Sequence, residues 1–164
     1  MLKSLIVAAI TSLALAGSAS LTPAFALDDQ VINVPNEDAD MAAAIAKARA
    51  SLPEFFKVME KPPAGVDGFS LKVKIPYGDG NSAEHFWLAD IERNGEKFAG
   101  TINNEPESAT QVTNGQRYEF GDADISDWMY MRNGKIVGNE TMRPLFKQMS
   151  KEEADQYRAM LESP

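Results

Sequence analysis

The sequence predicts an α+β domain, in which an N-terminal helix packs on an antiparallel sheet of about five strands and short helices close the chain. Three observations predict this class. Apolar residues recur every three or four positions across residues 41–59, which is the period of a helix. From Phe69 to Ile75 they alternate with polar residues, which is the period of a strand. Two Asn-Gly pairs, at 94–95 and 133–134, are typical of hairpin turns.

The first helix is predicted from one apolar stripe, made of Met41, Ile45, Ala48, Leu52, Phe55 and Met59. Asp38 or Asp40 is suited to cap its start. Pro53 lies inside the pattern, where it removes a backbone hydrogen bond and clashes with the preceding turn. We therefore expect a kink near Pro53, or a second short helix that begins at Ser51.

The strands are expected around residues 69–75, 84–91, 97–103, 117–120, 125–131 and 135–139. A helix over residues 141–149 should follow, with an apolar face that includes Leu145 and Phe146. Ser150 and Glu153 form an S-x-x-E capping box, which predicts a last helix that runs through Leu161. A helix, then strands, then helices in this order favour the α+β class.

Residues 1–26 have the pattern of a secretory signal peptide. Lys3 precedes an apolar run over residues 5–16, and Ala24-Phe25-Ala26 gives an A-x-A cleavage site. The run is shorter than the roughly 20 residues that span a bilayer. We expect cleavage after Ala26, a flexible arm over residues 27–37, and a single domain over residues 38–164. The predicted location is the periplasm or the medium, with no membrane insertion after cleavage.

The composition limits the possible partners. The 164-residue chain has a formal net charge of −8, which argues against nucleic acid and anionic lipid as ligands because both attract clustered Lys and Arg. There is no cysteine, so the chain can form neither a disulfide nor a thiol nucleophile. No phosphate-binding loop, dinucleotide fingerprint or nucleophile elbow is present. We expect no cofactor.

The densest cluster of candidate functional residues is Glu84-His85-Phe86-Trp87. The single histidine of the chain and Trp87 share one face of a predicted strand. His85 is a candidate acid-base group, oriented by Glu84 or Asp127, and Trp87 is a candidate stacking platform. In the structural alternative, which we favour, Phe86 and Leu88 point inward while His85 and Trp87 form a partly covered second face.

A second cluster lies in residues 125–130. Trp128 and Tyr130 share one face and Asp127 faces the other way. The two aromatics either line a ligand groove together with Trp87 or belong to the core beneath a helix; we favour the core. Arg143 either clamps a carboxylate or phosphate ligand, or forms an ion pair with Asp127 or Glu84; here too we favour the structural role.

The acidic loop residues give only a weak indication of metal binding. Asp122, Asp124 and Asp127, and separately Asp79 with Asn81, place oxygen ligands near loops. Neither set matches the twelve-residue calcium loop. We assign no metal site.

The order of several short motifs resembles the YegJ-like family of bacterial proteins. The matching residues are Glu84-His85-Phe86-Trp87, Gly100, Ile102, Gly115-Gln116, Ile125-Ser126-Asp127-Trp128, Gly138 and Thr141-x-Arg143. The resemblance covers roughly residues 39–143. It implies a compact α+β domain, often exported, and offers no cofactor and no catalytic residue to carry over.

We therefore favour a non-enzymatic binding or interaction module of the bacterial envelope, whose partner is a small molecule or an envelope protein. One alternative is a hydrolase or isomerase that acts on envelope material through His85 and a carboxylate. Another is an inhibitor or immunity-type protein whose acidic surface matches a basic partner.

Overall fold

The computed structural model describes residues 39–163. The predicted signal peptide, the arm over residues 27–37 and the Asp38 cap lie outside the described residues. In chain order the elements are α1 (Ala39–Glu60), β1 (Val66–Tyr77), β2 (Ser82–Asn94), β3 (Lys97–Ile102), β4 (Arg117–Phe120), the 3₁₀ turn η1 (Asp122–Asp124), β5 (Ile125–Arg132), β6 (Lys135–Gly138), α2 (Met142–Leu145) and α3 (Lys151–Met160).

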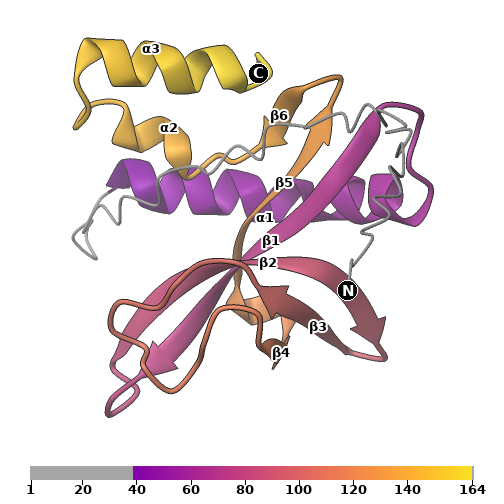
Figure 1. Ribbon diagram of the computed structural model, residues 1–164, viewed down its shortest axis with the longest axis vertical. Helices are drawn as coiled ribbons and strands as arrows, with labels where there is room; N and C mark the ends of the chain where they lie inside the picture. The colour runs from indigo at the N-terminus through magenta and orange to yellow at the C-terminus, as the bar shows by residue number, and fades with distance from the viewer. Residues whose placement is uncertain (1–38, 164) are drawn as a thin grey trace, which may run out of the picture.

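The strands form a single antiparallel sheet in the order β4-β3-β2-β1-β5-β6, with β1 and β2 in its interior. The sheet has six strands, one at each of the six expected segments, although about five strands were expected for the sheet as a whole. α1 crosses one face of this sheet and contacts β5, and α2 lies beside α1 (Figure 1). The α+β class is confirmed.

α1 is one continuous helix through Pro53, so the expectation of a second helix beginning at Ser51 is wrong. Ser51 behaves as an interior residue, since its hydroxyl donates to the carbonyls of Lys47 (3.1 Å) and Ala48 (3.0 Å). An interior proline costs roughly 3 kcal/mol. Burying the stripe of Ala48, Leu52 and Phe55 on both sides of Pro53 offsets that cost, because each large side chain contributes roughly 1.5–3 kcal/mol.

The core lies between α1 and the sheet. The alternation predicted for the first strand is confirmed, since Leu71, Val73 and Ile75 are buried together with Phe86 and Leu88 of β2. Asn133 and Gly134 both have positive φ, 50° and 77°, and form the two-residue turn between β5 and β6 that an Asn-Gly pair predicts. In the β2–β3 hairpin Asn94 still pairs with Lys97, so the turn begins one residue later, at Gly95.

The C-terminal helices differ from the prediction at their ends. α2 is only one turn long, because hydrogen bonds from residue i to i−3 replace the α-helical pattern after it, as in Phe146 N to Arg143 O. The capping box of α3 is confirmed, with Ser150 Oγ accepting from Glu153 N. Leu161 leaves that helix and bridges to Ile136 at the edge of β6. Of the helices within residues 39–163, none combines the length and apolarity needed to cross a bilayer.

Candidate functional site

The side of the sheet opposite α1, here called the outer face, carries three of the residues singled out from the sequence: His85, Trp87 and Asp127. In β2, Phe86 and Leu88 are fully buried toward α1, so His85 and Trp87 point to the outer face. Lys72 of β1 pairs in register with both Trp87 and Asp127. Three interior strands thus bring these side chains into one row.

A β-bulge in β5 determines which residues join this row. Lys72 pairs with Asp127, but the next residue of β1, Val73, pairs with Ile125. Ser126 is therefore the extra residue of the bulge, and its side chain lies on the same face as that of Asp127. Trp128 then returns to the α1 side, where its indole N–H donates to Ala48 O at 3.0 Å.

Ser126 connects His85 to the backbone of β1. His85 Nδ1 lies 2.8 Å from Ser126 Oγ, which lies 3.2 Å from Lys72 O. A carbonyl can only accept, so the Ser126 hydroxyl donates its proton to Lys72 O. Nδ1 of His85 then carries the ring proton and donates it to Ser126 Oγ. The assignment leaves Nε2 of the neutral imidazole as an acceptor.

The imidazole of His85 is neutral at pH 7. Its pKa is lowered from 6.5 to about 4, first because the surrounding protein desolvates the ring and then because of the charges of Lys72 and Lys74. The residue is still exposed on one side. His85 is thus an uncharged, accessible group near the charges of Lys72 and Lys74.

Asp127 is fully buried and has a structural set of partners. Its carboxylate accepts from Trp128 N at 2.8 Å, Thr141 N at 2.7 Å, Thr141 Oγ1 at 2.7 Å and Glu140 N at 3.2 Å. Burial raises the pKa of Asp127, while the bonds from Thr141 and Trp128 and the charge of Lys72 act to lower it. These hydrogen bonds hold the segment after β6 against β5.

Lys72 links the hydrogen-bonded pair of Asp127 and Thr141 to Trp87. Its ammonium lies 3.3 Å from Thr141 Oγ1 and 5.4 Å from the centroid of the Trp87 ring. The Thr141 proton goes to Asp127, so its oxygen accepts from Lys72. The second contact is a cation–π interaction. Sequence reasoning missed Lys72, Ser126 and Thr141 as members of the site.

Glu84 lies on the opposite side of β2 from His85 and does not orient it. Its carboxylate accepts from three consecutive backbone N–H groups, those of Glu107 (2.9 Å), Ser108 (2.9 Å) and Ala109 (2.8 Å). Burial acts to raise the pKa of Glu84, but the three hydrogen bonds outweigh it and the pKa is lowered. Glu84 anchors the loop between β3 and β4.

The other candidate ligand-binding residues lie elsewhere. Trp128 and Tyr130 are 7% and 5% exposed and pack against Phe55 of α1, with ring centroids 5.4 Å and 6.5 Å away. They belong to the core and do not line a groove with Trp87. Arg143 pairs with Glu140 at 3.1 Å rather than with Asp127 or Glu84, so its expected partners were wrong.

The acidic loop residues have local roles. Asp124 Oδ2 accepts from Gly121 N at 2.9 Å, and Asp79 accepts from Asn81 through N (3.0 Å) and Nδ2 (2.8 Å). Across residues 39–163, no three acidic or histidine side chains gather as a metal site would require.

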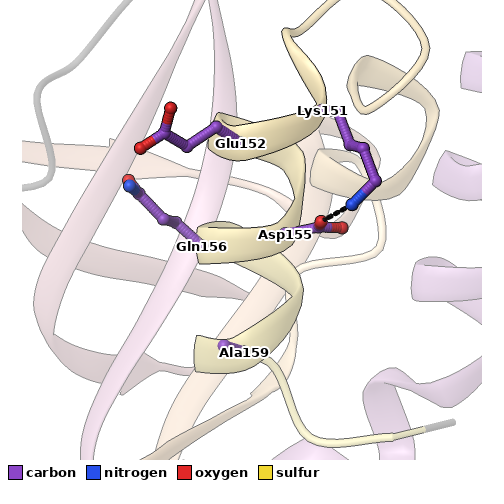
Figure 2. A pocket seen from close by; sticks show the side chains of 5 residues that line it. All are labelled: Lys151, Glu152, Asp155, Gln156 and Ala159. Carbon is purple, nitrogen blue, oxygen red and sulfur yellow. Dashed lines mark hydrogen bonds and ion pairs between the residues drawn. The ribbon is translucent and has the colours of Figure 1, made fainter.

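A shallow hollow on the surface of α3 shares no residue with the outer face. It is lined by Lys151, Glu152, Asp155, Gln156 and Ala159. Figure 2 shows that all five come from this one helix and that Lys151 pairs with Asp155. A site built from one exposed helix face offers no converging polar groups, and we assign it no role.

The accessible groups around His85 are therefore cationic and aromatic. Lys74 and His85 are exposed, and Lys72 and Trp87 are half-buried. The acidic member, Asp127, is fully buried and Ser126 is 5% exposed. Within the part of the chain that the structure describes, neither Glu84 nor Asp127 directs its carboxylate to His85.

Comparison with known proteins identifies the family of the chain. Residues 38–162 match the family described as "Uncharacterized protein conserved in bacteria (DUF2314)". The chain belongs to this family. A relative is the uncharacterized protein YegJ of Escherichia coli, 44% identical over 121 residues, which cover 74% of this chain and 76% of YegJ.

A second relative is a putative ankyrin repeat protein of Neisseria meningitidis serogroup B. It is 37% identical over 91 residues, which are 53% of this chain and 36% of that protein. The shared region is thus one part of a longer polypeptide there. Among solved structures, none matches the chain. The resemblance to YegJ-like proteins is confirmed by the family match and by YegJ itself.

Proposed function

We propose that this member of the family is a non-enzymatic binding module of the bacterial envelope, and that the outer face is its ligand-contacting surface. One observation carries the proposal: accessible groups are held in place by buried ones. Ser126 positions the His85 ring, and Thr141, fixed by Asp127, positions the Lys72 ammonium beside Trp87. Preorganised side chains reduce the entropy lost on binding.

The envelope location rests on the predicted signal peptide over residues 1–26. A chain exported by such a signal peptide would meet its ligand outside the cytoplasm. The absence of cysteine is compatible with an oxidising compartment, since no thiol is present to be oxidised.

The hydrolase or isomerase alternative has one contact in its favour, the 2.8 Å distance between His85 Nδ1 and Ser126 Oγ. Two features oppose it. Ser126 is 5% exposed, so a substrate would have little access to its hydroxyl. Neither Glu84 nor Asp127 has its carboxylate on His85, so the third member of a triad is missing from the described contacts.

Native mass spectrometry of the protein purified gently from its own cells tests the proposal. We expect a reproducible excess mass that is lost in Trp87→Ala. The matched control is Gln156→Ala on the exposed surface of α3, which should keep the bound mass. A bare protein, or a bound mass that survives Trp87→Ala, would overturn the assignment of the outer face. A stoichiometric basic protein as the bound species would instead favour the inhibitor alternative.

A further inference from the structure

We propose that two copies of this chain associate by antiparallel pairing of their β4 strands, which joins the two sheets into one. The interaction surface is the free backbone edge of β4 together with the side chains of Arg117 and Glu119. The partner is a second copy of the chain. The inference concerns the edge of the sheet and does not depend on a ligand of the outer face.

The two edges of the sheet differ in how the chain covers them. β6 lies at one edge and β4 at the other. The C-terminal segment covers β6, since Leu161 bridges to Ile136 and Glu162 N donates to Ile136 O at 2.7 Å. Within residues 39–163, no segment pairs with β4 on the side away from β3. An uncovered edge presents N–H and C=O groups with the spacing that another strand requires.

Two residues of β4 direct their backbone groups to this free edge. Ile102 N donates to Gln116 O at 2.9 Å, so the backbone of Ile102 faces β4. Backbone groups alternate in direction along a strand, so Gly100 also faces β4 and exchanges hydrogen bonds with its register partner Tyr118. The residues on either side of Tyr118 therefore direct their N–H and C=O groups away from β3. These two residues are Arg117 and Glu119.

The charges of these two residues select one register for self-pairing. When the two-fold axis passes through Tyr118, Arg117 of each copy lies opposite Glu119 of the other. An axis through Arg117 or Glu119 instead places that residue opposite itself, with two like charges facing each other. Opposite charges directly across an antiparallel pair stabilise it, and like charges destabilise it. The favoured register is also the one that uses both free residues of each strand.

Both side chains are accessible to a second copy, because both residues are exposed on the outer face. The Glu119 carboxylate has no ion pair or hydrogen bond within residues 39–163. Arg117 donates to Asp90 O at 2.7 Å and pairs with Glu92 at 2.9 Å, and its side chain is 41% exposed. A guanidinium has five N–H donors, so Arg117 can keep these contacts and donate to a further carboxylate. The same contacts hold Arg117 in place at the edge before a second copy arrives.

Sedimentation equilibrium of the protein purified from its own cells tests the inference. A strand of four residues makes a short contact, so we expect a weak dimer. Between about 10 µM and about 1 mM protein, the weight-average mass should rise from that of one chain toward that of two. Glu119→Arg places two arginines opposite each other and should raise the dimer Kd about tenfold or more. The matched control, Glu96→Arg at an exposed position of the β2–β3 turn, should change the Kd less than twofold.

A mixture of two charge variants separates lost pairing from lost folding. Arg117→Glu places two glutamates opposite each other, so this variant should also remain a single chain. One variant then carries two arginines at these positions and the other carries two glutamates, so every cross-strand pair in their heterodimer is oppositely charged. The mixture should therefore associate at least as tightly as the unmodified chain. A misfolded variant would not regain association on mixing.

Three outcomes would overturn the inference. They are the mass of one chain at every concentration, an unchanged dimer Kd in Glu119→Arg, and a mixture of the two variants that fails to associate. The bound mass sought by native mass spectrometry tests the outer face separately, so the two proposals fail independently.

Discussion

The two faces of the sheet are built on the same strands but differ in the contacts that their side chains make. Toward α1, Phe55 packs against Phe56, Phe69, Trp128 and Tyr130, with ring centroids 5.4–6.5 Å apart. Toward the outer face the contacts are hydrogen bonds and a cation–π pair. The first set is apolar packing, and the second consists of polar contacts around the surface that we propose as the ligand-contacting one.

Neighbouring residues in β5 illustrate the difference. Trp128 is anchored in the core by packing and by its indole hydrogen bond, whereas Asp127 contributes only polar contacts on the other side. Losing packing leaves a cavity, and losing a polar partner leaves unsatisfied donors. Both changes lower the free energy of unfolding, the first through lost packing and the second through buried donors without an acceptor.

The largest expected effect is that of Trp128→Ala. Truncation removes the ring that packs against Phe55 and Tyr130, and we expect the free energy of unfolding to fall by about 3–5 kcal/mol. Urea denaturation measures this. Trp87→Ala is the matched control on the outer face and should cost less than half as much, because Trp87 is only half-buried. Equal losses for the two variants would break the comparison between the faces.

A smaller loss is expected for Asp127→Ala. Four donors from Trp128, Glu140 and Thr141 would lose their acceptor, and we expect a destabilisation of about 2–3 kcal/mol. Amide hydrogen exchange should also accelerate at residues 139–141. If exchange there is unchanged while stability falls, Asp127 does not hold this segment.

Glu84→Gln should cost about 1–2 kcal/mol, because a neutral amide replaces a carboxylate that accepts three charge-assisted hydrogen bonds. The amides of Glu107, Ser108 and Ala109 should exchange faster. Glu92→Gln removes an exposed ion pair and should cost no more than about 1 kcal/mol. Slow exchange at residues 107–109 in Glu84→Gln would remove Glu84 from its anchoring role.

Much of this fold could be predicted because local periodicity and turn chemistry agree with the final packing. The alternation from Phe69 to Ile75, the Asn133-Gly134 turn and the Ser150 capping box all act within a few residues. Pro53 shows the limit of such reasoning. The local penalty predicted a kink or a second short helix there, and the second helix is wrong because burial of the stripe along α1 lets the helix continue through Pro53.

The candidate site was predictable only in part. Strand alternation correctly placed His85 and Trp87 on one face and Asp127 opposite Trp128. The partners of these residues depend on pairing between distant strands, and the β-bulge at Ser126 shifts that pairing by one residue. Periodicity carries no information on such a shift. Periodicity also does not distinguish Lys72 from other polar strand residues. Nor does it predict the contact between Thr141 and Asp127, which are 14 positions apart in the chain.

The smallest effect, and the most specific to the outer face, concerns the titration of His85. With its pKa lowered to about 4, the folded protein binds the His85 proton less readily than the unfolded chain, whose histidine titrates near 6.5. Stability should therefore rise with pH between about 4 and 6.5 through this group. In His85→Gln that contribution to the slope should disappear while carboxylate titrations remain. NMR of the imidazole carbons measures the pKa directly. A value near 6.5 would mean that neither desolvation nor the lysines act on the ring.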